Sequence, residues 1–89
     1  MSGPASLMAE KPFGRPVVVS GGPNGETVTI ASARQAADFL MTGWPGERNE
    51  WHRDALDACL KVIEGYRSTE DAETAFREAA ARAGILTSD

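Results

Sequence analysis

Several features are scarce in this sequence: it contains one cysteine, one histidine, no long apolar run and no surplus of basic residues. A single cysteine, Cys59, excludes an internal disulfide and a multi-cysteine metal site, and it favours a reducing, cytoplasmic setting. A membrane-spanning helix needs about 20 consecutive apolar residues, and no stretch of the sequence approaches that length. The N-terminal stretch MSGPASLMAEKP lacks the basic start and apolar centre of a secretory signal. We therefore expect no membrane partner.

Basic residues are too few and too dispersed for a nucleic-acid binder. The nine Lys and Arg are scattered among thirteen Asp and Glu, which gives a formal net charge of −4. A protein that binds a phosphate backbone presents a basic stripe or patch, which this sequence does not offer. The stretch TEDAETAFREAAARAGI resembles the first helix of a helix-turn-helix unit, but only four residues follow Ile85. A nucleic-acid-associated regulator is therefore the least favoured alternative.

Length and composition indicate one small folded domain. The 89 residues are 42% hydrophobic and 25% charged, which is typical of a globular protein. Residues 1–12 mix Ser, Gly, Pro and Ala, so we expect a flexible tail there and a single domain over residues 13–87. A chain of this size builds only a small core, which leaves little room for a deep pocket.

Two segments, RPVVVS and ETVTI, predict an antiparallel β-hairpin. β-Branched residues dominate both segments, and Asn24-Gly25 between them is a strong signal for a tight hairpin turn. Pairing about that turn makes one face of the hairpin apolar, with Val17, Val19, Val28 and Ile30. An isolated hairpin is only marginally stable, so helices are expected to cover this face.

Three helices are predicted after the hairpin, over residues 32–43, 47–64 and 69–83. Each segment repeats apolar residues at the spacing of one helix face. The fold predicted is therefore α+β, with element order ββααα and a short third strand over residues 85–87 left open. The predicted buried stripes are Ala33, Ala36, Ala37, Leu40 and Met41; Trp51, Ala55, Ala58, Cys59, Val62 and Tyr66, widened by Leu56, Leu60 and Ile63; and Ala72, Ala75, Phe76, Ala79, Ala80 and Ala83.

Capping residues and glycines mark the helix ends. Ser32 and Ser68 each stand three residues before a side chain that can complete a capping box. Gly43, Gly65 and Gly84 stand where a residue in the left-handed conformation ends a helix.

The stretch TGWPGERNEWHRDAL, residues 42–56, holds both tryptophans and the only histidine, and it is the candidate functional site. In one interpretation, Trp44, Arg48, Trp51 and His52 form a ligand or partner surface, with Arg48 or Arg53 holding an anion. In the competing interpretation the stretch is a structural corner, in which the tryptophans fill the space between two helices. The chain would then turn at four residues, Gly43, Trp44, Pro45 and Gly46.

The candidate residues lack the partners that catalysis requires. No carboxylate shares the predicted helical face of His52, whose neighbour four residues earlier is Arg48, so we expect a surface or boundary histidine. Cys59 lies in the middle of a helix without an activating group and is expected to be buried as a small hydrophobic residue. The carboxylates are better explained as solvated helix faces than as metal ligands. We therefore predict no catalytic residue, no metal site and no cofactor.

The sequence resembles a small bacterial family known as domain-of-unknown-function family 982. The resemblance rests on RPVVV, on ASARQAADFLMTGWP and on HRDALDACLKVIEGYRSTEDAETAFREAAARAGIL, with the Trp44-Pro45 corner as its most specific feature. It covers roughly residues 13–87. It implies a bacterial cytoplasmic origin and supports the domain limits, but it implies no activity, cofactor or catalytic residue.

These observations favour a non-enzymatic protein-interaction or regulatory module, with a homodimer as one form of it. The hairpin edge and the alanine-rich helix face are the surfaces through which a second chain would pair. The alternative is a small-ligand binder or enzyme that uses the corner of Trp44, Trp51 and His52. The sequence does not identify the protein partner.

Overall fold

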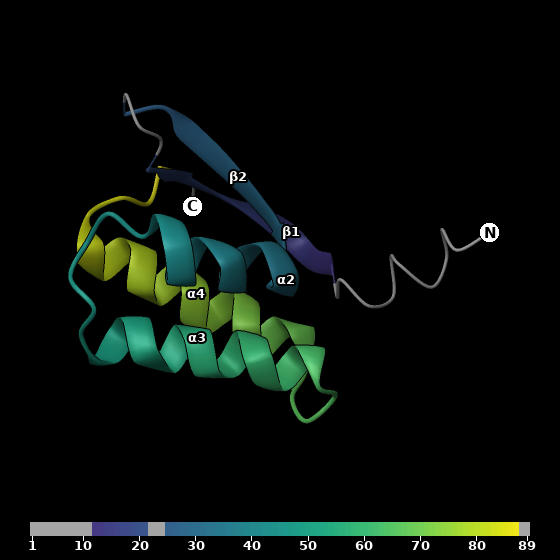
Figure 1. The fold of residues 1–89 in the computed structure, drawn as a ribbon. Helices are drawn as coiled ribbons and strands as arrows, with labels where there is room; N and C mark the ends of the chain where they lie inside the picture. Colours follow the sequence, from purple (N-terminus) through teal and green to yellow (C-terminus); the bar gives the residue numbers. More distant parts are fainter. Residues whose placement is uncertain (1–11, 22–24, 88–89) are drawn as a thin grey trace.

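The computed structural model describes residues 12–21 and 25–87, which form an antiparallel hairpin followed by three helices (Figure 1). The predicted α+β order ββααα is therefore confirmed. The predicted tail lies outside the described residues except for Pro12, which begins the first strand, and the domain limits stay a prediction. The elements are β1 (Pro12–Ser20), β2 (Thr27–Ser32), α2 (Ala33–Asp38) with its π-helical continuation η1 (Phe39–Gly43), α3 (Glu50–Ile63) and α4 (Thr69–Ala83).

The elements form three layers. Helix α2 packs on β2 and helix α4 packs on β1, so these two helices cover the apolar face of the hairpin. Helix α3 packs chiefly on α2 and α4, on the side away from the strands, as Figure 1 shows. Because α3 is the outermost layer, it has one flank facing α4, another facing α2, and an outer surface that no described element covers.

The hairpin buries the face that the sequence predicts. Val17 pairs with Ile30 and Val19 with Val28, and Val17, Val19 and Ile30 are at most 2% exposed. These side chains share one face because strand residues two apart point the same way. The alternating pattern of the sequence therefore gives the correct inside and outside of the sheet.

The register differs from the one that a two-residue turn at Asn24-Gly25 would give. The last pair of the ladder is Ser20 with Thr27, and the Gly21 amide donates to the Glu26 carbonyl at 3.1 Å, so the connection is longer than two residues. Residues 22–24 of this turn lie outside the described part of the chain. A shift by two residues leaves every side chain on its original face, which is why the burial prediction still holds.

The C-terminal segment adds to the free edge of β1. Leu86 forms a single antiparallel bridge with Val19, the Ser20 amide donates to the Ile85 carbonyl at 2.7 Å, and the Thr87 amide donates to the Val18 carbonyl at 2.9 Å. The open prediction of a third strand thus becomes one bridge rather than a full strand. Along this part of β1 the hairpin edge is already paired, whereas no described strand pairs with the outer edge of β2.

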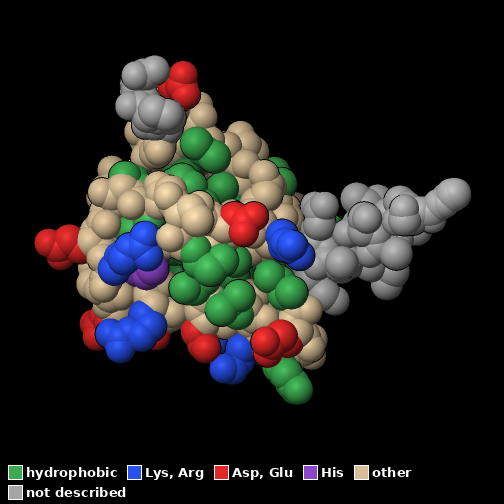
Figure 2. Space-filling view, in the orientation of Figure 1, with side chains coloured by type: hydrophobic (Ala, Val, Ile, Leu, Met, Phe, Trp, Pro, Cys, Tyr) green, Lys and Arg blue, Asp and Glu red, His purple; other side chains and the backbone are tan. Residues whose placement is uncertain are grey.

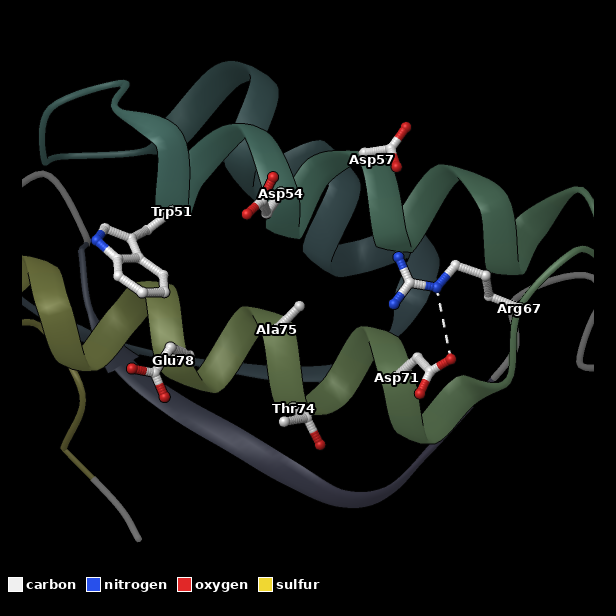
Figure 3. A pocket seen from close by; sticks show the side chains of 8 residues that line it. All are labelled: Trp51, Asp54, Asp57, Arg67, Asp71, Thr74, Ala75 and Glu78. Carbon is white, nitrogen blue, oxygen red and sulfur yellow. Dashed lines mark hydrogen bonds and ion pairs between the residues drawn. The ribbon is translucent and has the colours of Figure 1, made fainter.

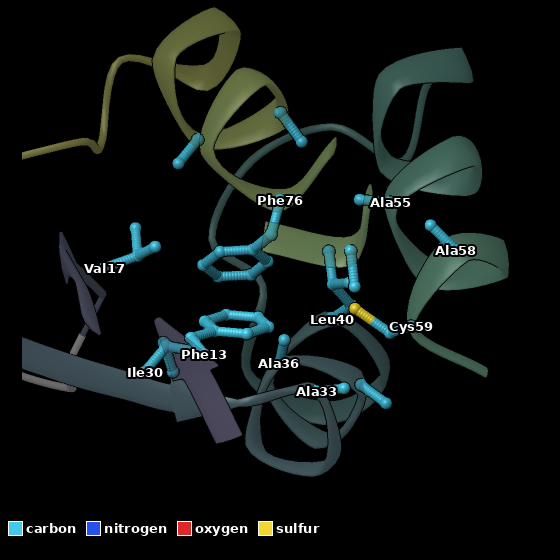
Figure 4. Packing of buried hydrophobic residues seen from close by; sticks show 14 of the residues in the cluster. Phe13, Val17, Ile30, Ala33, Ala36, Leu40, Ala55, Ala58, Cys59 and Phe76 are labelled. Atoms are coloured by element: carbon cyan, nitrogen blue, oxygen red, sulfur yellow. The ribbon is translucent and has the colours of Figure 1, made fainter. Parts of the chain in front are cut away.

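Phe76 of α4 is the largest fully buried side chain, and it points from α4 into the space between the hairpin and the helices (Figure 4). Around it, most of the buried helix residues are alanines, which allow helices to approach closely. Three residues of the predicted stripes are exposed instead: Met41 by 44%, Leu60 by 39% and Tyr66 by 77%. Tyr66 follows Gly65, whose φ of 91° has already ended the helix, and Met41 follows the phase change that a π-helical turn introduces.

The ends of α4 are predicted correctly. Ser68 caps the start, with its hydroxyl accepting the Asp71 amide at 3.3 Å, and Gly84 ends the helix in the left-handed conformation with φ 75°. At α2 the Ser32 hydroxyl accepts the Gln35 amide at 3.1 Å, while the Gln35 side chain reaches back to the amide of Ala31. That bond lies one residue before the amide that a capping box uses.

Candidate functional site

The corner between α2 and α3 is built differently from the prediction. Gly43 does not end the preceding helix in the left-handed conformation, because the helix widens into η1 and the chain leaves through Trp44 in an extended conformation, with φ −69° and ψ 119°. Helix α3 begins at Glu50 rather than at Glu47. Its cap is Asn49, whose side chain accepts the amides of Trp51 at 3.1 Å and His52 at 3.2 Å. Asparagine is a favoured N-cap, so this start was visible in the sequence.

Gly46 allows the corner to lie close to the end of α4. A Cβ atom at this position would meet the Ala83 Cβ at 3.1 Å and the Trp44 indole nitrogen at 3.2 Å. Such contacts are tighter than ordinary van der Waals distances, so a larger residue would push the corner away from α4. The Pro45-Gly46 pair therefore both turns the chain and fits the corner against the core.

Trp44 is buried at this corner. Its side chain is 9% exposed, and its indole N–H donates to the Glu47 carbonyl at 3.2 Å. The ring makes edge-to-face contacts with Phe39, Phe76 and His52 at centroid distances of 5.8, 6.2 and 5.5 Å. Such contacts add to the burial of a large aromatic ring and fix its orientation.

His52 is buried, so the prediction of a surface or boundary histidine is wrong. Only 5% of the His52 surface is exposed, and its Nε2–H donates to the Leu40 carbonyl at 2.7 Å. The last carbonyls of a helix lack intrahelical partners, and a buried carbonyl without a donor is costly. The Nε2–H group of the imidazole is used here to satisfy the end of the preceding helix. This role requires a tertiary contact that helical spacing within α3 does not show.

Arg48 acts at the same helix end. Its guanidinium Nη2 donates to the Met41 carbonyl at 3.1 Å, one residue beyond the carbonyl that His52 binds. Arg48 precedes α3, so it does not share a helix face with His52 as predicted. The two residues are nevertheless neighbours, because both donate to the negative, C-terminal end of η1.

Trp51 lies apart from Trp44, on the flank of α3 that faces α4. It is partly buried, and the guanidinium carbon of Arg82 lies 4.2 Å from the centre of its ring. Arg82 also pairs with Glu78 at 2.9 Å. The structure therefore brings Trp44, His52 and Arg48 together at one helix end and leaves Trp51 in a separate place.

Trp51 forms one end of a groove between α3 and α4, which we call the acidic groove (Figure 3). The groove has a volume of about 530 Å³. Figure 3 shows Trp51 and Glu78 toward one end and the Arg67–Asp71 pair toward the other. Four of its eight lining residues are acidic and one is basic; they are Trp51, Asp54, Asp57, Arg67, Asp71, Thr74, Ala75 and Glu78. Of these residues only Trp51 belongs to the surface predicted from the sequence, because a groove between two helices depends on how they pack.

The described part of the chain holds one buried thiol and no cluster of metal-ligating side chains. Cys59 is buried without a polar partner, and burial raises the pKa of its thiol to about 12, which suppresses the thiolate. Nowhere in residues 12–21 and 25–87 do three His, Cys, Asp or Glu side chains come together to hold a metal ion. Among the same residues, every helix is too short or too polar to cross a membrane.

Comparisons with known proteins give a family but no activity. The family model for DUF982, described as a protein of unknown function, matches residues 15–87. The fold is similar to the NMR structure of the Agrobacterium tumefaciens protein Atu1219, a structural genomics target, with a TM-score of 0.73 and 31% sequence identity over 90% of this chain and 79% of that chain. None of the curated proteins matches the sequence.

Proposed function

We propose that this chain, which belongs to the DUF982 family, is a protein-interaction module whose acidic groove binds a basic segment of a partner protein. The observation that supports the proposal is the groove of about 530 Å³ with a tryptophan at one end and carboxylates along its walls. A groove between two helices that is open to solvent suits an extended segment with one or two anchoring side chains better than it suits an enzyme's substrate.

The chemistry of the groove favours arginine as the anchoring side chain. The Trp51 ring already holds the Arg82 guanidinium at 4.2 Å, which is a cation–π contact and shows that a guanidinium fits on that face. Glu78 lies beside the same ring and pairs with Arg82. A partner's arginine can replace Arg82 there and keep both the stacking contact and the carboxylate.

The groove also has negative charge to offer a second cation. Asp57, Asp71 and Glu78 each pair with a basic residue four positions away, but these pairs are exposed by about half and contribute little to stability. Asp54 has no ion pair within the described residues. Exchange of such weak pairs for a partner's cations costs little, so the carboxylates remain available for binding.

The proposal is tested by NMR titration with a short arginine-rich peptide, using a matched peptide with citrulline in place of arginine as the control. The two indole N–H signals separate Trp51 from Trp44, whose N–H is bonded inside the corner. We expect the arginine peptide to shift the Trp51 signal and leave the Trp44 signal in place, with binding that weakens as salt is added. Equal shifts with the citrulline peptide would contradict the proposal.

Three variants sharpen this titration. Asp54→Asn and Trp51→Leu are expected to weaken binding, whereas Glu26→Gln removes the same charge from the exposed hairpin end and is expected to have no effect. Arg82→Gln removes the guanidinium that occupies the Trp51 ring, so it is expected to tighten binding. If spermidine binds as tightly as the peptide, the groove takes small organic cations, and the assignment of a protein partner is wrong.

A further inference from the structure

An apolar strip runs along the flank of α3 that faces away from the acidic groove. Leu56, Leu60 and Ile63 follow one another at the four- and three-residue spacing of a single helix face. Leu60 is 39% exposed, while Leu56 and Ile63 are partly buried. Met41, which is 44% exposed, lies beside the first turns of α3 because His52 and Arg48 hold the end of η1 there. Figure 2 shows hydrophobic side chains gathered on this face, and we call Met41, Leu56, Leu60 and Ile63 the α3 patch.

Two opposite charges without partners flank the α3 patch along the helix. Arg53 lies one turn before Leu56, and Glu64 lies one turn after Leu60. The four ion pairs of the described residues use other side chains, and neither the Arg53 nor the Glu64 side chain makes a hydrogen bond within those residues. The strip therefore has a positive end and a negative end, with apolar residues between them.

We propose that the α3 patch binds a second copy of this chain, with the two α3 helices antiparallel about a twofold axis at the level of residue 58. This register places Leu56 against the partner's Leu60 and brings Arg53 next to the partner's Glu64. A twofold axis repeats each contact, so the interface contains two apolar contacts and two opposite-charge contacts. The antiparallel arrangement also sets the positive end of each helix dipole beside the negative end of the other.

The charges at the two ends of the α3 patch favour a second copy of this chain as its binding partner. A surface with Arg53 at one end and Glu64 at the other is complementary to itself when it is rotated by half a turn. One helix flank of Glu50–Ile63, about 21 Å long, supports only a small interface, so the dimer is expected to be weak and to depend on concentration. The patch and the acidic groove lie on different flanks of α3, so this inference does not rest on the proposed function.

Sedimentation velocity from micromolar to millimolar concentration tests the dimer. The apparent mass of the native chain is expected to rise with concentration from 9.5 kDa toward twice that value. The apparent mass of Leu60→Asp is expected to stay at 9.5 kDa throughout. Because Leu60 is partly exposed, this variant should fold, and its circular dichroism is compared with that of the full chain. Leu60→Ser serves as a milder second variant. A full chain that remains monomeric at millimolar concentration, or a dimer unaffected by Leu60→Asp, overturns the proposal.

A charge exchange tests the antiparallel arrangement. Arg53→Glu or Glu64→Arg alone puts like charges together twice and is expected to weaken the dimer by roughly tenfold or more. The double variant Arg53→Glu/Glu64→Arg restores opposite pairs and is expected to recover the dimer. Glu26→Arg, a charge reversal at the exposed hairpin end, is the control and should leave dimerisation unchanged. If the double variant dimerises no better than the single ones, the proposed pairing of Arg53 with Glu64 is wrong.

Discussion

The two tryptophans stand seven residues apart in one stretch of sequence, yet they belong to different parts of the molecule. Trp44 is 9% exposed, donates a hydrogen bond to the Glu47 carbonyl and contacts three other aromatic rings. Trp51 is partly buried, lies at the end of the acidic groove and carries the Arg82 guanidinium on its face. One ring therefore holds the corner together, and the other is left at a surface where it can be used for binding.

The difference follows from where α3 begins. Asn49 caps the helix, and its first turn then directs His52 toward η1 and Trp51 toward α4. Consecutive residues of a helix point about 100° apart, so they contact different neighbours. A cluster of rare residues in the sequence can thus contribute to two unrelated parts of the structure.

Replacement of each tryptophan by alanine is expected to give the largest difference in stability between the buried corner and the groove. Trp44→Ala leaves a cavity in the aromatic cluster and is expected to cost about 3–5 kcal/mol of unfolding free energy. Trp51→Ala removes a partly exposed ring and is expected to cost about 1 kcal/mol or less. Urea denaturation followed by circular dichroism measures both. Equal losses would mean that the two rings are equally structural and would remove the distinction.

The stability of the buried corner around Trp44 is also expected to depend on His52, to a smaller extent. His52→Ala leaves the Leu40 carbonyl without its donor inside the protein, and we expect a loss of about 2 kcal/mol in unfolding free energy. His52→Gln retains an N–H donor on a side chain of similar reach, so part of that stability should return. The same urea titration measures both variants. A Gln variant as unstable as the Ala variant would indicate that ring packing on Trp44, rather than the hydrogen bond, is what His52 contributes.

Most of the fold follows from local patterns, while the site does not. Alternation in the strands, the Ser68 cap and Gly84 give the hairpin faces and the bounds of α4 correctly, because each depends on neighbours in the sequence. His52 is buried in contact with the Leu40 carbonyl, twelve positions earlier in the chain, and no local pattern encodes such a contact. The acidic groove likewise exists only once α3 and α4 pack together.

The burial of Cys59 is expected to make the stability of the protein depend on pH. Burial raises the pKa of its thiol from 9.0 to about 12, so above pH 9 the unfolded chain loses a proton that the folded chain keeps. The unfolded state then binds fewer protons, and stability must fall as pH rises from about 9 toward 12, by about 1.4 kcal/mol per pH unit at most. Urea midpoints measured across this window should fall in the native chain. In Cys59→Ala this part of the slope should vanish, and an identical slope would show that other groups cause it.

The smallest expected effect lies at the surface part, between Trp51 and Arg82. A cation–π contact at an exposed site is worth about 0.5–1 kcal/mol, so Trp51→Leu and Arg82→Gln should each change stability little. A double-mutant cycle isolates their coupling, which we expect to be about 0.5 kcal/mol. Coupling of about 2 kcal/mol or more would place Trp51 with the structural residues beside Trp44. Weak coupling means that Arg82 leaves the ring at little cost, which is what a binding surface for a partner's arginine requires.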